Sequence, residues 1–412
     1  MKKLIDYLKN EFNSYSRNIK ITLVVLFALV ALFIVFGIQI LFWGLGYTDM
    51  SNLYPFGQWI IGDLGLVALG GGAFTTGFFL YIFRVDKLEP IINSTVLIGL
   101  MCYLFTLVFL VFDIGQPLRA WFGYIYPNWG PHLLPQSMLT EVVWCLTLYF
   151  CILIIEFIPI PLKHKLLDQF PALHYIGHYM HKLMWIMAAA GTFLSFFHQG
   201  SLGGGMWGVM YAKPVWFDPM YFFWVIPAAM SGGTSFMILC AYIAGKVMKK
   251  EVVPAETFQI LARISGFMLI IFLITNGIHV YTQAATYVPS FDRNYFDIFG
   301  GYYGFWMVVL EFAATIGAIV LLNIKKFREQ EKFFLAGISL GAFGVAMSKC
   351  TVVLHGSSVP NFPWRPFIGY NPTIQEWFVF LGGLACMVLI YMWAAKYLPL
   401  FPHLDKHEHG EH

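Results

Sequence analysis

The chain has few charged residues: Asp, Glu, Lys and Arg together make up 11% of its 412 residues. Soluble domains carry about 25%. Because 59% of the residues are hydrophobic and the mean hydropathy is +0.69, polar side chains cannot cover a water-exposed surface. This composition excludes an ordinary soluble protein. The formal net charge is only +3, and we expect no nucleic-acid partner.

The chain also lacks the cysteine spacing of a cluster-binding protein. Its six cysteines include no C-x-x-C pair, which argues against an iron–sulfur cluster or a zinc site held by this chain. Each lies within or beside an apolar run, and we expect small buried hydrophobic residues: Cys102, Cys145, Cys151, Cys240, Cys350 and Cys386. We expect no metal site and no haem, since the histidines of the apolar runs lie near the ends of different helices.

Long apolar runs recur along the chain, and each is long enough to span the ~30 Å hydrocarbon layer. The first is too long for a signal-peptide core, so we expect it to be retained as a helix. Ten membrane-spanning helices are predicted, near residues 21–46, 57–83, 91–113, 139–161, 181–199, 219–247, 258–284, 302–324, 333–355 and 376–398.

The basic residues set the orientation of these helices. Cytoplasmic connections of membrane proteins are rich in Lys and Arg. Only four of the 25 lysines and arginines fall in connections on the side opposite the N-terminus: Arg119, Lys213, Arg293 and Arg365. We therefore expect both termini to be cytoplasmic. The outer connections, rich in Pro, Gly, Trp and Tyr, form either an interfacial aromatic belt or a docking platform for an extrinsic subunit.

An internal repeat suggests how the helices are grouped. We expect an all-α polytopic membrane protein with two four-helix bundles in tandem and one flanking helix at each end. The segments are 1–56 (N-terminus and first helix), 57–200 (first bundle), 201–356 (second bundle) and 357–412 (last helix and a His-rich tail). The repeated landmarks are Gly71-Gly72 with Gly232-Gly233, Tyr81-Ile82 with Tyr242-Ile243, and His198-Gln199-Gly200-Ser201 with His355-Gly356-Ser357-Ser358. Paired glycines allow helices to approach closely.

Four ionisable residues are expected at the same depth of the first bundle, near its outer side: Asp63, Asp113, Glu141 and His198. Charged groups inside a bilayer are costly and usually face a cavity or a partner. Each acid could instead cap a helix end or pair with a neighbour, and Arg119 is close enough in sequence to pair with Asp113.

Such a set suits an apolar ring molecule with carbonyl groups, such as a quinone. Histidine can hydrogen-bond a carbonyl in either protonation state, and a buried carboxylic acid can exchange protons. We expect Trp59, Gln199, Arg119, Gly71 and Gly72 to complete the binding site. Further ionisable residues outline a tentative proton path: Glu156, Glu311, Lys349, His279 and His355. Glu156 could equally lie at the cytoplasmic interface, and Lys349 could be a structural ion-pair partner of Glu311.

Several motifs, in this order, resemble the NrfD/PsrC family, most closely its ten-helix, HybB-like branch. One departure is Gly200, where the family pattern leads us to expect serine. The motifs are Tyr54–Ile60, the glycine triplet within Ala68–Thr75, Phe112–Pro117, Glu141–Trp144, Leu194–Gly203 and Lys396–Pro402. The resemblance covers roughly residues 50–400.

The resemblance implies an integral subunit of a respiratory oxidoreductase in a bacterial cytoplasmic (inner) membrane. Such a subunit binds menaquinone or another quinone near the outer face and carries no redox centre. It exchanges electrons with an extrinsic, ferredoxin-like iron–sulfur subunit, alongside further catalytic or cytochrome subunits. Two other functions remain open from the residues alone: a secondary transporter or proton channel built from duplicated bundles, and a purely structural anchor.

Overall fold

The structure of the chain is a computed structural model that describes residues 15–125, 138–162, 182–203 and 213–401, with Tyr175, Gly177, Tyr179 and Met180. Its regular secondary structure in these ranges is entirely helical. The long helices are α2 (Arg17–Trp43), α3 (Gln58–Gly77), α4 (Glu89–Asp113), α6 (Met138–Phe157), α9 (Met184–Gly200), α10 (Tyr221–Met248), α11 (Ala255–Thr282), α12 (Gly304–Asn323), α14 (Glu331–Cys350) and α16 (Ile374–Tyr397).

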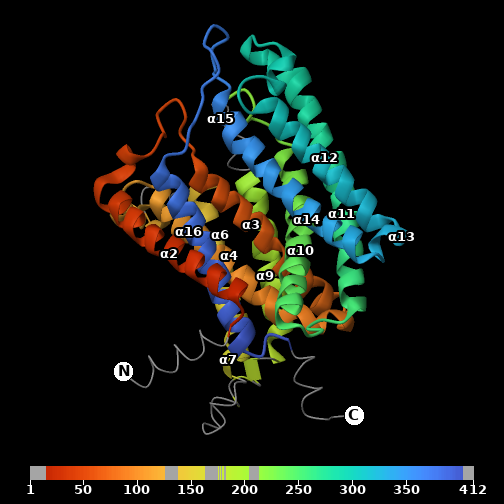
Figure 1. Cartoon of the computed structure of the whole chain (residues 1–412). Coiled ribbons are helices and arrows are strands. Elements are labelled where there is room, and N and C mark those ends of the chain that lie inside the picture. Colours follow the sequence, from red (N-terminus) through yellow and green to blue (C-terminus); the bar gives the residue numbers. More distant parts are fainter. Residues whose placement is uncertain are drawn as a thin grey trace.

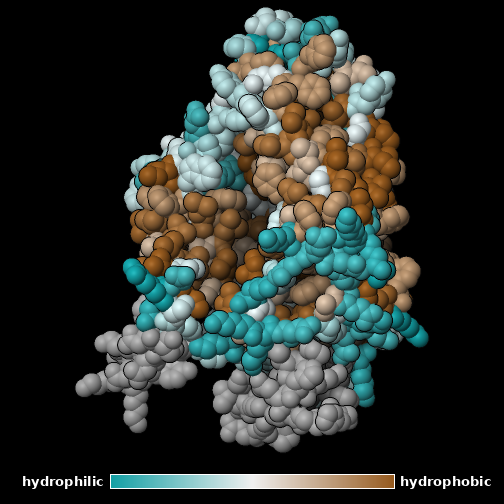
Figure 2. Space-filling view, turned by 45° about the vertical axis from the view of Figure 1, so that its right-hand side comes forward, coloured by the Kyte–Doolittle hydropathy of each residue, from teal (hydrophilic) through white to brown (hydrophobic). Residues whose placement is uncertain are grey.

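Nine helices in the described ranges are long and apolar enough to cross a membrane. They coincide with nine of the ten expected spans. The tenth expected span, 181–199, corresponds to α9, whose 17 residues reach about 26 Å, slightly less than the hydrocarbon thickness. Crossing by α9 therefore stays a prediction. Figure 2 shows an apolar surface across the middle of the molecule, above a hydrophilic lower border.

The helices differ in how deeply they are buried. In the most apolar stretch of α10, 72% of the residues are buried, whereas the corresponding value for α2 is 6%. Figure 1 shows α10 near the centre and α2 beside α16 at one edge. We name two sets of helices by chain order, and contacts between α3 and α10 join them at the centre of the molecule. The first helix group comprises α3, α4, α6 and α9, and the second comprises α10, α11, α12 and α14.

Glycines allow the two groups to meet closely. A Cβ atom at Gly72 would overlap the carbonyl group of Gly233, and one at Gly233 would overlap the backbone of Gly72. Next to this contact, a Cβ at Gly71 would lie 2.9 Å from Cβ of Ala229. The repeated glycine pairs are thus the point of closest approach of α3 and α10. Gly71 and Gly72, expected to contact a ligand, lie at this helix–helix contact, and their contact with a ligand stays a prediction.

Local sequence explains where several helices begin and end. Pro90 lies in the first turn of α4, where its missing N–H costs no hydrogen bond. The chain leaves α4 through Gly115, whose φ of +67° favours glycine. At α16, Thr373 and Glu376 form a reciprocal capping box. The π-helical turn η10 (Thr351–His355) continues α14, and Ser201–Gly203 form a similar turn after α9.

The connections at the end of the molecule that the sequence predicts to be the outer one are held by buried cations. Lys213 Nζ donates to the carbonyl oxygens of Leu53 (3.0 Å) and Ser357 (2.9 Å). Burial and the nearby Arg293 lower the pKa of Lys213 to about 8. Arg293 forms an ion pair with Asp297 and donates to three carbonyl groups, those of Pro360, Phe362 and Arg365. These bonds order the outer connections of the second helix group into one unit.

A second outer network joins α16 to the start of α3. The Tyr370 hydroxyl donates to the Glu376 carboxylate and accepts from the backbone N–H of Gln58 (2.8 Å). Glu376 also accepts from the backbone N–H groups of Asp49 and Thr373. Burial and Glu376 raise the pKa of Tyr370, so that its hydroxyl keeps the proton that it donates. The network fixes the first turn of α3.

The cysteines are free thiols, and one expectation about them is wrong. Cys102 and Cys145 are buried, and three others are partly buried, but Cys151 is exposed. It lies on an exposed face of the apolar helix α6. An apolar neighbourhood in sequence does not distinguish these two environments.

Candidate functional site

The last turns of α9 bring His198 into the middle of the first helix group. Its side chain is fully buried. Neither ring nitrogen has a hydrogen-bond partner among the residues that the structure describes. The ring of Tyr103, on α4, lies 5.9 Å from the imidazole, centroid to centroid. The backbone of Val142, on α6, lies near the imidazole without forming a hydrogen bond of ordinary geometry, so a further molecule can bond the ring nitrogens.

Other buried polar atoms of the first helix group also lack a hydrogen bond of ordinary geometry in the described part of the chain: Trp59 Nε1, Asp63 Oδ1, Tyr103 Oη and Ser195 Oγ. Ser195 and Gln199 lie close to the Tyr103 hydroxyl. An unsatisfied buried polar atom costs about 1–3 kcal/mol. Several such atoms in one helix group are typical of a place that binds a polar ligand or ordered water.

Two side-chain bonds fix the helices around these atoms. Gln199 Nε2 donates to the carbonyl oxygen of Val67 (3.0 Å), which ties the end of α9 to α3. Thr106 Oγ1 donates to the carbonyl oxygen of Asp63 (3.4 Å), which ties α4 to α3 one turn away. Because Asp63 and Val67 are four residues apart, both bonds lie on neighbouring turns of α3. Asp63 and His198 are therefore brought to the same part of the group.

Glu141 joins the site from a fourth helix. Ser201 Oγ donates to Glu141 Oε1 (2.5 Å), which connects the first turn of α6 with the turn that follows α9. Three of the four predicted ionisable residues, Asp63, Glu141 and His198, thus lie around the contacts of α9 with α3, α4 and α6.

Asp113 lies farther out, at the last residue of α4, and one of its oxygens is buried without a partner. The pairing with Arg119 suggested by sequence does not occur: Arg119 is exposed, and no ion pair joins the two in the described structure. The chain turns at Gly115 and directs the following 3₁₀ turn, Pro117–Arg119, away from the helix end. Asp113 and Trp59 occupy the outer edge, where Trp59 packs on Phe112 (5.9 Å between ring centroids).

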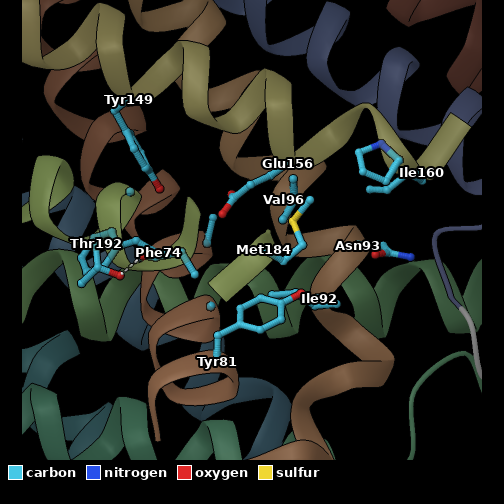
Figure 3. Close-up of a pocket in the computed structure, with 15 residues that line it drawn as sticks. Phe74, Tyr81, Ile92, Asn93, Val96, Tyr149, Glu156, Ile160, Met184 and Thr192 are labelled. Carbon is cyan, nitrogen blue, oxygen red and sulfur yellow. Dashed lines mark hydrogen bonds between the residues drawn. The ribbon is translucent and has the colours of Figure 1, made fainter. Parts of the chain in front are cut away.

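A small cavity lies at the opposite end of the first helix group (Figure 3). Glu156 and Tyr149 of α6 point into it from one side, and Tyr81 and Met184 approach from others. Its volume of about 30 Å³ admits one or two water molecules but no quinone ring. Tyr149 also contacts Tyr103 edge to face, 4.6 Å between ring centroids. Aromatic and hydroxyl groups therefore connect the surroundings of Glu156 with those of His198.

Comparison with known proteins places the chain in a family. Residues 46–361 match the family described as "Polysulphide reductase, NrfD". The chain belongs to the NrfD family. It is similar to the integral membrane subunit of menaquinone reductase from Nitratidesulfovibrio vulgaris (34% identity, covering 87% of this chain and 86% of the relative). It is also similar to a probable Ni/Fe-hydrogenase 2 b-type cytochrome subunit from Escherichia coli (24% identity, covering 90% of this chain and 90% of the relative). A third relative is an Hdr-like menaquinol oxidoreductase integral membrane subunit from Archaeoglobus fulgidus (21% identity, covering 87% of this chain and 88% of the relative).

The family match, with the nine apolar helices, makes this NrfD protein a multi-pass integral membrane protein. The resemblance seen in the motifs is therefore confirmed. Over the described ranges, no group of three or more His, Cys, Asp or Glu residues is placed to hold a metal ion.

The second helix group of this NrfD protein holds a separate polar network. Glu311 is buried and accepts hydrogen bonds from Asn276 and from Thr351 (2.8 Å for Thr351). No ion pair links it to Lys349, because the Lys349 ammonium instead lies over the ring of Trp224, 4.5 Å from its centroid. The direct pair suggested by sequence is thus replaced by neutral donors to Glu311 and a cation–π contact for Lys349.

The two histidines of the predicted proton path, His279 and His355, lie in or beside the second helix group. His279 bonds through Nδ1 to the carboxylate of Asp218, which is fully buried before the first turn of α10. His355, the repeat counterpart of His198, is also fully buried, and neither of its ring nitrogens has a partner in the described ranges. Both repeats therefore hold an unpartnered histidine.

Sequence reasoning missed several members of these networks. Tyr103 and Tyr149 looked like ordinary aromatic residues of apolar runs, and Ser201 like part of a loop. A usable signal was helical spacing: Tyr103 and Thr106 are three residues apart on one face, as are Ser195 and His198. Asp218 and Glu376 could not be found in this way, since their partners come from distant helices.

Proposed function

We propose that this chain is the quinone-reactive membrane subunit of a respiratory oxidoreductase complex. It would exchange electrons between menaquinone, or another quinone, and an extrinsic iron–sulfur subunit at the outer face. One observation carries the proposal: fully buried His198 has two unpartnered ring nitrogens and lies among other unpartnered polar atoms. The relatives named for menaquinone reductase and menaquinol oxidoreductase support it.

The residues present fit a quinone. When bound, a quinone supplies two-electron, two-proton redox chemistry. His198 would hydrogen-bond one ring oxygen, and Trp59 and Tyr103 offer further donors from α3 and α4. Asp63 or Glu141 would hold and release the proton, and Gln199, fixed on Val67, would keep the end of α9 in place. Asp113 lies at the outer edge, while exposed Arg119 is left outside this set.

We further propose that protons reach this site from the cytoplasmic side through the first helix group. The cavity at Glu156 admits water, and the Tyr149–Tyr103 contact leads from it towards His198. Glu156 lies about 22 Å along α6 from Glu141 at a rise of 1.5 Å per residue. The two acids would thus stand at opposite ends of one path.

Replacing Glu156 with Gln tests this path. The expected result is nearly unchanged quinone reduction by the detergent-solubilised complex but at least a tenfold loss of charge translocation in proteoliposomes, because proton uptake by a water-accessible acid is removed. Glu89→Gln is the matched control, since Glu89 is an exposed acid at the start of α4. Equal translocation by both variants would contradict the path.

The proposal also covers the number of membrane spans, their orientation and the grouping of the helices. We propose ten spans with both termini cytoplasmic, and two four-helix bundles that arose by duplication. The bundles would correspond to the first and second helix groups. Support comes from the close contact of the repeated glycine pairs and from the two unpartnered histidines. In this topology, the networks around Arg293 and Glu376 lie outside, where an extrinsic subunit would dock.

One observation favours a second candidate function, a proton or ion transporter. The second helix group buries Glu311, Lys349 and the Asp218–His279 pair, and buried ionisable residues of this kind also mark ion pathways. In this alternative the network would move ions by itself, without a quinone reaction. A purely structural anchor would need neither the polar residues around His198 nor the buried ionisable residues of the second helix group.

The purified native complex distinguishes these functions. We expect organic extraction to recover bound quinone, and an iron–sulfur subunit to co-purify and to reduce a menaquinone analogue. Proteoliposomes containing the chain alone should show no ion flux without an electron donor. Flux by the isolated chain, with no quinone and no redox partner in the complex, would contradict the proposal and support a transporter.

A further inference from the structure

A groove on the second helix group lies far from the candidate quinone site. It is formed where α10 ends, where α11 and α14 begin, and at the short helix α13 (Lys325–Arg328), and its volume is about 530 Å³. This is the side that the basic connections assign to the cytoplasm. In Figure 2, the hydrophilic lower border of the molecule adjoins the apolar surface. The groove is large enough for a lipid headgroup.

Two kinds of wall line the groove. Its basic wall consists of Lys246, Lys249, Lys250 and Arg328, and its apolar wall of Tyr242, Val252, Phe258 and Phe334; the two meet where Lys246 lies over the Tyr242 ring. Three carboxylates also line the groove, those of Glu251, Glu329 and Glu331. A basic wall beside an apolar wall at a membrane boundary is the arrangement that an anionic phospholipid requires.

Arg328 is the buried element of the basic wall, with 9% of its surface exposed. Its Nε donates to Gln259 Oε1 (2.9 Å) and its Nη1 to the carbonyl oxygen of Leu322 (2.8 Å). In the described chain, Nη2 has no acceptor and no carboxylate lies within 4.0 Å. Burial and nearby Arg263 lower the pKa of Arg328, so its positive charge is held at a cost. A bound anion would relieve that cost.

The acids around the groove do not supply that anion. Glu331 pairs with Lys246 and accepts from the Tyr242 hydroxyl, and Glu329 pairs with Lys325 (3.6 Å). Glu251 is exposed and forms no ion pair with Arg328. Four cations and three carboxylates line the groove, so its lining carries an excess of one positive charge.

We propose that this groove binds the phosphate group of an anionic phospholipid. The phosphate would lie between Arg328 and the two lysines Lys249 and Lys250, and an acyl chain would extend over Phe258 and Phe334. Guanidinium groups bind phosphate oxygens strongly. Inorganic phosphate has the same charged chemistry, but the apolar wall favours the lipid. The site would stabilise the cytoplasmic end of the second helix group.

The test compares two double variants of the full-length protein purified in detergent. Lys249→Gln with Lys250→Gln removes two charges from the groove. The control variant, Lys326→Gln with Lys332→Gln, removes two charges from the same end of the molecule, at exposed residues that do not line the groove. Native mass spectrometry measures bound lipid, and thermal unfolding measures stabilisation by phosphatidylglycerol, phosphatidylcholine or inorganic phosphate. Arg328 is left intact because its carbonyl bonds also hold the chain.

The wild-type protein and the control variant should retain phosphatidylglycerol, and both should be stabilised by it. The groove variant should bind it about 30-fold more weakly, at roughly fivefold for each lysine. Equal binding by the two variants would overturn the site. Equal stabilisation by phosphatidylcholine would overturn recognition of the anionic group, and full stabilisation by inorganic phosphate alone would overturn the assignment to a lipid.

Discussion

His198→Ala should lower quinone turnover by about 100-fold or more, while the complex still assembles and its iron–sulfur centres are still reduced by the donor. The imidazole is the one group of the site whose two polar atoms are both buried and unpartnered, so its removal breaks no protein hydrogen bond in the described structure. A positioned acid–base group typically contributes 10²–10⁴-fold. Steady-state reduction of a menaquinone analogue, with the centres followed separately by spectroscopy, measures the effect.

His355→Ala is the matched control for this variant. It removes a buried, unpartnered histidine from the corresponding place in the second repeat, so any general cost of the cavity should be similar. Quinone turnover should stay within a few-fold of wild type. His198→Gln should recover part of the activity because the amide can still donate to a carbonyl oxygen. Normal turnover in His198→Ala, or an equal loss in His355→Ala, would remove the basis of the proposed site.

Gly72→Leu should prevent the protein from accumulating in a folded state. Even a Cβ atom at this position would overlap the backbone of Gly233, so a leucine must push α3 and α10 apart. Gly72→Ala should already destabilise the protein by more than about 1–3 kcal/mol, the usual cost of overpacking, because backbone rather than a flexible side chain is in the way. Yield of monodisperse protein and thermal unfolding in detergent are the measurements.

Gly65→Leu provides the comparison on the same helix. A Cβ at Gly65 meets no atom within 4 Å, so the leucine can be accommodated and the yield should stay close to that of wild type. If Gly72→Leu were as stable as Gly65→Leu, the close contact of α3 with α10 would not be required for folding.

Helix positions followed well from sequence. Nine of the ten apolar runs coincide with helices of the described ranges that are long and apolar enough to cross a membrane, because chain length across a bilayer and backbone hydrogen bonding leave few other conformations. The ends were less predictable. The π-helical turns Phe78–Ile82, Gln283–Tyr287 and Thr351–His355 continue helices beyond their regular α-helical part. Such turns depend on local packing, which periodicity does not encode.

The candidate site was only partly predictable. His198, Asp63 and Glu141 stood out because ionisable residues are rare in apolar runs. Their neighbours Tyr103 and Tyr149 did not, since aromatic residues are common there. The pairings inferred from sequence, Asp113 with Arg119 and Glu311 with Lys349, both failed. Proximity in sequence, or opposite charge on two helices, does not specify which way each side chain points.

The sequence by itself determined that this protein is a helical membrane protein and which family it resembles, and it predicts which way the spans face under the positive-inside rule. These properties depend on composition, on run length and on motif order, and each can be read locally. Only the tertiary structure decided that Gly72 meets Gly233, that Glu156 faces a water-sized cavity, and that Arg328 lines a groove without a counter-ion. The reason is physical: these features depend on contacts between helices far apart in the chain, and apolar spans of similar composition can pack in many ways until particular side chains meet.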